Sequence, residues 1–389
     1  MATEKRKMHG VVTIYTIGLA VIFVVLFIIG IVGAAITKSF AALSVGLIIL
    51  SLLGICFCAL GFLGLQFSNK SLPLMKYYIP TYFGGIIALH VMFMFICFAA
   101  FGISPSLSFI PTMEIDEITK IFKGIKPQDL LTIVDYVAKI QKGMTLVAVF
   151  ALVVSLLCLG QVALFFFYLK MDRFLELFMA SSSILVLILG LFISIFLLVV
   201  QPYNMKFGGV TIFPSWIYVI VIVFGFIMSA VGGCGLFATF FGKTHKIVSI
   251  IYLVATLTLT LVFLILFIIS LCIQGPYVKT MENMCNADPS VEPEVDCNKI
   301  LSRLKVNTCG YITDPDKKQQ CENSVNIQTV TTHAKNMIRG YLGLLSWILI
   351  YLTIFLGAVI ACTALNAFRK TPDSIRYDNL GDDAPTIVE

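Results

Sequence analysis

Eight long apolar runs dominate the sequence, and each is long enough to cross a lipid bilayer. An α-helix needs about 20 apolar residues to span the hydrocarbon core. No run alternates with a period of two residues, which argues against a membrane β-barrel. The sequence therefore predicts an all-α polytopic integral membrane protein with eight transmembrane helices. The predicted spans are residues 11–37, 40–67, 77–102, 144–169, 174–201, 211–241, 247–274 and 341–368.

The composition excludes two other classes of protein. Of the 389 residues, 59% are hydrophobic and only 12% are charged, whereas soluble domains carry about 25% charged residues. A water-soluble enzyme and a disordered chain are both incompatible with this balance. The first apolar run is much longer than the core of a cleaved signal peptide, so we expect a retained signal anchor.

Lysine and arginine in the short loops predict the orientation. Cytosolic loops are enriched in these residues, and the bias here favours cytosolic N- and C-termini. The loops expected to be cytosolic hold Lys5, Arg6, Lys7, Lys70, Lys76, Lys170, Arg173, Lys243, Lys246, Arg369, Lys370 and Arg376, against Lys38 and Lys206 in the short outer loops. We expect a multi-pass protein of the plasma membrane or of an endosomal or vesicle membrane. The net charge of +6 does not indicate a nucleic-acid partner, because the part of it in the short loops is explained by the enrichment of Lys and Arg on the cytosolic side.

The two longest loops lie in corresponding places, after the third span and after the seventh. Four spans return the chain to the same side of the membrane, so the pattern predicts two parallel four-helix modules rather than inverted repeats. The predicted boundaries are 1–170 for the first module, with outer loop 103–143, 171–370 for the second, with outer loop 275–338, and 371–389 for a cytosolic tail.

The first outer loop has no cysteine and is expected to be helical. Ile115, Ile118, Ile121, Phe122 and Ile125 have the spacing of an amphipathic helix. A second helix is expected to start at Pro127 and to continue into the fourth span, because proline suits the first position of a helix.

The second outer loop carries four cysteines in a short polar segment, which predicts two disulfides in one of three pairings. A zinc site would need closely spaced Cys/His pairs, and the loop has none, so disulfides are favoured over zinc. These cysteines are Cys285, Cys297, Cys309 and Cys321. After the last of them, residues 325–339 are expected to form a helix that runs into the eighth span.

Ionisable side chains are rare inside the spans. His90 is the only one away from a span end, and a lone histidine favours a hydrogen bond to a neighbouring helix over a proton or metal site. Gln161 and Asn366 are expected to hydrogen-bond between helices. The catalytic and nucleotide-binding motifs that we sought are missing, so we predict no enzyme activity and no cofactor or metal site.

Small residues at a spacing of four predict close helix packing. Gly225, Ser229 and Gly233 form such a series on the sixth span, and Gly30 and Ala34 form a shorter one on the first. Small residues let two helix backbones approach closely. Packing within the bundle is the favoured interpretation, ahead of an oligomer contact.

The chain resembles the tetraspanins, as two tandem copies. Gly232-Gly233-Cys234-Gly235-Leu236 is similar to the Gly-Cys-Cys-Gly-Ala stretch of that family, and Asn69-Lys70-Ser71-Leu72 is similar to its polar turn before the third span. The family's Cys-Cys-Gly signature is reduced here to Cys309-Gly310. The resemblance implies a membrane-organising scaffold at the cell surface that contacts lipids and other membrane proteins or itself. It also offers Cys234 and Cys362 as possible palmitoylation sites, although a buried apolar cysteine is the favoured interpretation of both.

Two further expectations complete the prediction. Tyr377 and Leu380, in the sequence Tyr-Asp-Asn-Leu, fit a tyrosine-based sorting signal in the tail. The alternative function is a transporter or channel for a small apolar or lipid-like solute that passes between the two modules.

Overall fold

The fold was analysed in a computed structural model. It describes residues 2–36, 41–67, 77–107, 110, 133–200, 206–207, 210–211, 215–241, 246–285, 297–310 and 312–368. Within these ranges, eight helices are long and apolar enough to cross a membrane, which confirms the predicted number of spans. They are α1 (Ala2–Ile36), α2 (Ala41–Gln66), α3 (Tyr78–Ser106), α5 (Ile133–Tyr168), α6 (Met171–Val200), α7 (Ser215–Phe241), α8 (Lys246–Cys285) and α11 (Ile327–Phe368).

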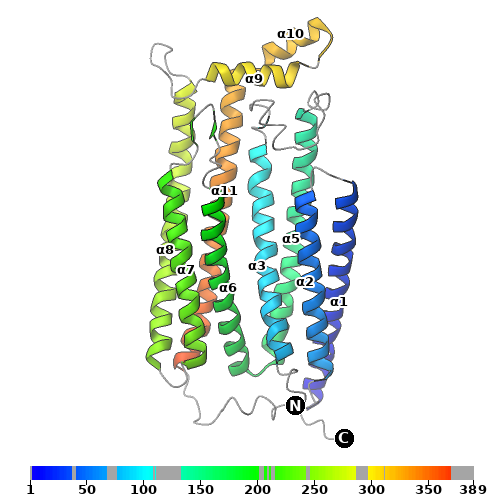
Figure 1. The fold of residues 1–389 in the computed structure, drawn as a ribbon, viewed down its shortest axis with the longest axis vertical. Coiled ribbons are helices and arrows are strands. Elements are labelled where there is room, and N and C mark those ends of the chain that lie inside the picture. Colours follow the sequence, from blue (N-terminus) through cyan, green and yellow to red (C-terminus); the bar gives the residue numbers. More distant parts are fainter. Residues whose placement is uncertain are drawn as a thin grey trace.

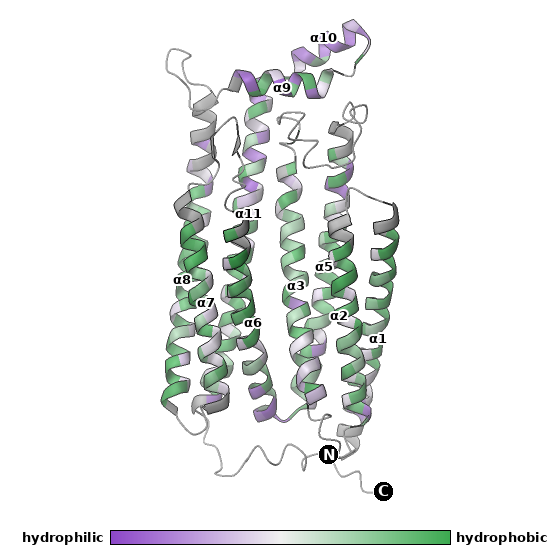
Figure 2. Cartoon of the chain, in the orientation of Figure 1, coloured by the Kyte–Doolittle hydropathy of each residue, from purple (hydrophilic) through white to green (hydrophobic). Residues whose placement is uncertain are grey.

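The long helices stand side by side and are mostly hydrophobic along their length (Figures 1 and 2), and many of their large apolar side chains are exposed. Ile14 of α1 is 72% exposed and Ile354 of α11 is 66% exposed. Such residues would be unfavourable in water but are suited to lipid, where a helix satisfies all its backbone hydrogen bonds internally. The all-α membrane fold expected from the composition is therefore present.

The helices form two bundles of four. In the first bundle, α1 contacts α2, α2 contacts α3, α3 contacts α5, and α5 returns to α1. The second bundle repeats this ring with α6, α7, α8 and α11. In both rings the first helix packs extensively on the second and the third on the fourth, while the other two contacts are smaller. The two halves of the chain are thus built alike.

One layer of polar helices covers an end of the bundles. It consists of α9 (Cys297–Cys309) and α10 (Pro315–Ser324), at the end opposite the start of α1 (Figure 1). We call these two helices the outer layer. Its small core joins Ile300 and Leu304 of α9 to Val330 and Met337 of α11. Because α9 contacts both α5 and α11, the outer layer touches both bundles.

The end of α9 is tied to α10 by a disulfide. Cys309 and Cys321 are bonded, with their Cα atoms 5.8 Å apart. A cross-link of this loop length stabilises a fold by about 2–4 kcal/mol. Asp314 caps α10, since its carboxylate accepts hydrogen bonds from the N–H groups of Asp316 and Lys317, and Pro315 follows it at the start of the helix.

Three helices extend well beyond the predicted spans. Helix α5 runs without a break from Ile133 into the fourth span, as predicted, while the predicted start at Pro127 lies outside the described residues. Helix α8 continues through Pro276 to Cys285. The predicted helix leading into the eighth span is confirmed, since α11 runs without a break from Ile327. A two-residue strand pair, β1 (Lys206–Phe207) with β2 (Val210–Thr211), precedes α7. The helix predicted at 115–125 lies outside the described residues.

Candidate functional site

Each bundle holds a buried tyrosine near the start of its third helix. In the first bundle the Tyr82 ring of α3 lies over Gly61 of α2, where an added Cβ would come within 2.6 Å of the ring. The Tyr82 hydroxyl is 3.0 Å from Thr16 Oγ1 on α1, and Gln161 Nε2 of α5 donates to the same threonine oxygen at 3.2 Å. One residue from each helix therefore meets at this point.

The second bundle repeats the arrangement with different residues. Tyr252 of α8 lies over Gly235 of α7, where an added Cβ would be 2.7 Å from the ring. Its hydroxyl is 3.2 Å from Ser183 Oγ on α6. The fourth helix also reaches the first, because Asn366 Nδ2 of α11 lies 3.5 Å from Met179 Sδ of α6. We call these two arrangements the tyrosine nodes. The hydrogen bonds of Gln161 and Asn366 agree with the interhelical role expected of both residues.

The contact between α6 and α7 follows small residues. An added Cβ at Gly225 would be 2.8 Å from the carbonyl oxygen of Gly190, and Ser229 Oγ donates to the carbonyl of Leu187 at 3.1 Å. Gly232 faces the backbone of Leu187, whereas a Cβ at Gly233 would meet only a methyl group at 3.9 Å. The close contact therefore runs through Gly225, Ser229 and Gly232, with Gly233 one position outside it.

The two bundles meet along one face of α3. This contact, which we call the seam, is made with α11 and to a smaller extent with α6. An added Cβ at Gly84 would lie 3.1 Å from Ser181 Oγ of α6, and one at Gly102 would be 3.1 Å from the carbonyl oxygen of Gly340 of α11. Both glycines therefore allow a close approach of the bundles.

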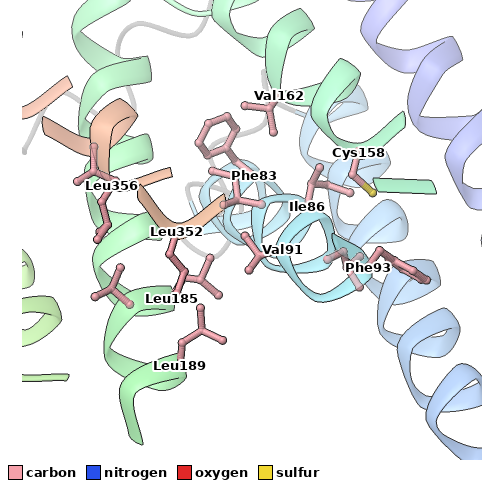
Figure 3. Close-up of a cluster of buried hydrophobic side chains, with 14 of the residues drawn as sticks. Phe83, Ile86, Val91, Phe93, Cys158, Val162, Leu185, Leu189, Leu352 and Leu356 are labelled. Carbon is pink, nitrogen blue, oxygen red and sulfur yellow. The ribbon is translucent and has the colours of Figure 1, made fainter. Parts of the chain in front are cut away.

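Apolar side chains fill the rest of the seam. Val91 of α3 is fully buried. Leu185 and Leu189 of α6 and Leu352 and Leu356 of α11 gather on one side of α3, and Cys158 and Val162 of α5 lie toward the other (Figure 3). All of these residues belong to one continuous buried cluster. Nearer the outer layer, Phe98 stacks on Trp347 with ring centroids 6.2 Å apart.

His90 lies between the bundles. Its Nδ1 is 2.7 Å from Ser155 Oγ of α5, which also donates to the His90 carbonyl. The Tyr351 ring of α11 meets the imidazole edge-on at 6.0 Å. The Tyr351 hydroxyl is buried and has no hydrogen-bond partner among the described residues. The structure thus gives His90 the hydrogen bond to a neighbouring helix that the sequence favoured.

The other predicted residues are distributed over the chain. Cys309 and Cys321 form the disulfide, while the side chains of Cys285 and Cys297 lie outside the described part. Cys234 is exposed on α7 and Cys362 is half-buried on α11. Gly30 is buried on α1. The side chain of Ala34, and the whole of Tyr377 and Leu380, also lie outside the described residues.

Comparison of the chain with known protein families, with curated proteins and with solved structures finds no match. The tetraspanin resemblance therefore rests on the sequence motifs and on the topology. In the structure, the stretch that carries it contacts two other helices, because Gly232 lies against α6 and Gly235 lies under Tyr252 of α8.

The α6–α7 contact yields a matched pair of substitutions. Gly225→Ala adds a methyl group against the Gly190 backbone, so we expect it to lower the free energy of unfolding by about 1–3 kcal/mol. Gly233→Ala adds the same group where there is room, and alanine favours the helix. Thermal unfolding in mild detergent should show a lower Tm for the first variant alone. Equal shifts for the two would contradict the packing described here.

Proposed function

We propose that this protein is a membrane-organising scaffold of tetraspanin type. In this role it makes lateral contacts with partner membrane proteins or with further copies of itself. The tandem arrangement and the Gly232–Leu236 motif support the likeness to tetraspanins. The proposal does not depend on any catalytic group or cofactor.

The seam is the observation that carries this proposal. Two bundles of the same design pack side by side through Gly84, Gly102 and the aromatic pair Phe98 and Trp347. Lipid chains are as apolar as the helices, so such packing depends on shape and close approach rather than on hydrophobicity. Within this chain, one bundle binds another side by side in the plane of the membrane. A membrane organiser requires a surface of this kind.

Joining both bundles in one chain also suits an organiser. Covalent linkage raises the effective concentration of one bundle near the other, so their pairing does not depend on expression level. The outer layer adds a polar surface, since α10 has no buried residue and is hydrophilic over most of its length (Figure 2). This surface is available for contact with extracellular or lumenal partners.

A specific observation also favours transport as a second candidate. His90 is the only ionisable residue within the spans away from their ends, and intramembrane ionisable residues commonly mark solute or proton pathways. It lies at the seam against the ring of Tyr351, and the Tyr351 hydroxyl has no hydrogen-bond partner in the described part of the chain. The solute would be small and apolar or lipid-like and would pass between the bundles.

One experiment separates the two candidates. The protein is extracted gently from its membrane, and its native mass and co-purifying components are measured by mass spectrometry. The scaffold proposal predicts a discrete oligomer or a stoichiometric protein partner. A monomer that carries a defined small molecule or lipid, with liposome uptake of that molecule lost in His90→Ala, would overturn the scaffold proposal in favour of transport.

We also propose that the outer layer faces the cell exterior or an organelle lumen, with both termini cytosolic. Disulfides persist in these oxidising compartments, and the outer layer contains Cys309–Cys321.

Labelling of surface-expressed protein on intact cells tests this orientation. Cys309→Ala should add one site for an impermeant maleimide, because it frees the thiol of Cys321, which is only half-buried. The Cys309 thiol that Cys321→Ala frees is buried and should stay unlabelled. A cysteine introduced at Ser374 should be labelled only after permeabilisation. Labelling of the Ser374→Cys tail on intact cells would contradict the orientation.

A further inference from the structure

The seam is asymmetric, because it uses different helices from the two bundles. The first bundle contributes its third helix, α3, and the second contributes its first and fourth helices, α6 and α11. The counterpart contact would join α8 to α1 and α5. Among the described residues, however, α8 packs extensively on α11 and to a smaller extent on α7, with no comparable contact to α1 or α5. Figure 1 shows α8 and α1 at opposite edges of the molecule.

The tyrosine nodes align α3 with α8 residue by residue. Starting from Tyr82 and Tyr252, the seam positions of α3 correspond to a single face of α8, which we call the α8 face. The seam positions Gly84, Ile87, Val91, Phe95, Phe98 and Gly102 correspond to Val254, Leu257, Leu261, Ile265, Ile268 and Cys272.

Burial differs sharply between these equivalent positions. Val91 is 0% exposed and Ile87 is 3% exposed on α3, whereas Leu261 and Leu257 of α8 are 51% and 47% exposed. Ile268, the counterpart of Phe98, is 51% exposed. The α8 face therefore has the position of a seam surface without a bundle covering it.

The complementary surface is present and uncovered on the first bundle. Helices α5 and α11 can be aligned through five buried residues of each that share one spacing: Ala148, Ala151, Ser155, Cys158 and Val162 match Leu349, Leu352, Leu356, Val359 and Thr363. On this alignment Leu344, Trp347 and Tyr351 of the seam correspond to Gly143, Leu146 and Phe150. Leu146 is 67% exposed, Phe150 is 47% exposed, and nothing lies within 4 Å of a Cβ at Gly143.

Helix α1 completes this surface. Helices α6 and α1 can be aligned because Ser183 and Thr16 hold the same place in their tyrosine nodes. On this alignment, Ser181 of the seam corresponds to Ile14, and Leu185 corresponds to Gly18. Ile14 is 72% exposed, and nothing lies within 4 Å of a Cβ at Gly18. The α1–α5 face, defined by Ile14, Gly18, Gly143, Leu146 and Phe150, is thus the open counterpart of the surface that binds α3.

We propose that copies of this chain associate head to tail, the α8 face of one copy packing on the α1–α5 face of the next. This inference rests on the proposed scaffold function and names the contact through which self-association occurs. A contact between two different surfaces of one protein is heterologous and generates a closed ring or an open file. Both halves of the contact are present on every copy, and the seam already joins their counterparts within one chain. A second copy is therefore the occupant with matching architecture.

The side chains imply a less intimate contact than the seam. Val254 and Cys272 stand where α3 has Gly84 and Gly102, so the backbones of two copies lie further apart than those of α3 and α11. Small residues on the opposite surface, Gly18 and Gly143, offset part of this bulk. Association between copies is accordingly weaker than association of the two bundles within a chain.

Cysteine cross-linking in the membrane tests the contact. Gly102 and Leu344 touch in the seam, since a Cβ at Gly102 would meet the Leu344 side chain; their counterparts are the native Cys272 and Gly143. In full-length protein with Cys56 and Cys234 changed to alanine, Gly143→Cys should form disulfides with Cys272 of a neighbouring copy upon mild oxidation. A ladder of dimers and larger species should appear on non-reducing gels.

Controls make the outcome specific. Thr145→Cys, exposed on another side of the same helix turn, should give no ladder, and adding Cys272→Ala to Gly143→Cys should abolish it. Two kinds of chain can then be mixed: one carries Gly143→Cys and Cys272→Ala, and the other keeps both Gly143 and Cys272. Each kind should form dimers with the other kind and not with itself. Absence of cross-linking, or cross-linking of one of these chains to itself, would overturn the head-to-tail contact. If the native mass still shows an oligomer, the scaffold proposal survives and a different surface joins the copies.

Discussion

Close approach of backbones is the interaction on which this structure depends. Helices in lipid gain little from hiding apolar surface from one another, because the surrounding chains are equally apolar. Packing and short interhelical hydrogen bonds must then select which faces meet. The glycines do this at each level: Gly61 and Gly235 receive the tyrosine rings inside the bundles, and Gly84 and Gly102 bring the bundles together. Replacing any of these by a larger residue would separate helices that have no other strong reason to associate.

The two halves keep one geometry with different residues. Each node places a tyrosine of the third helix over a glycine of the second and within hydrogen-bond distance of a hydroxyl on the first. Seven residues further along the first helix of each bundle, the contacts with the second helix differ between the two halves. The first bundle packs Phe23 on Gly54, and the second sets Gly190 against Gly225. The similarity is therefore one of contact positions, which explains why it is weak in the sequence and clear in the structure.

Sequence reasoning predicted the parts of the fold that depend on length and hydropathy. The eight spans follow from the apolar runs, and the lead into α11 follows from its helical pattern. The seam could not be predicted, because a helix that is apolar on every side carries no pattern that tells which face meets protein and which meets lipid. Tyr82 and Tyr252 gave no signal for the same reason. Spacing alone identified Gly225 and Ser229, but it selected Gly233 where the structure uses Gly232.

Separating the bundles tests most directly whether the seam holds them together. The chain would be divided between Lys170 and Met171, in the short link between α5 and α6, and the two halves co-expressed with a tag on the first. We predict that the second half co-purifies in equal amount, that Gly102→Phe on α3 abolishes this, and that Gly46→Phe on α2, where a Cβ meets nothing within 4 Å, does not. Halves that fail to associate, or that associate equally well with Gly102→Phe, would contradict the account.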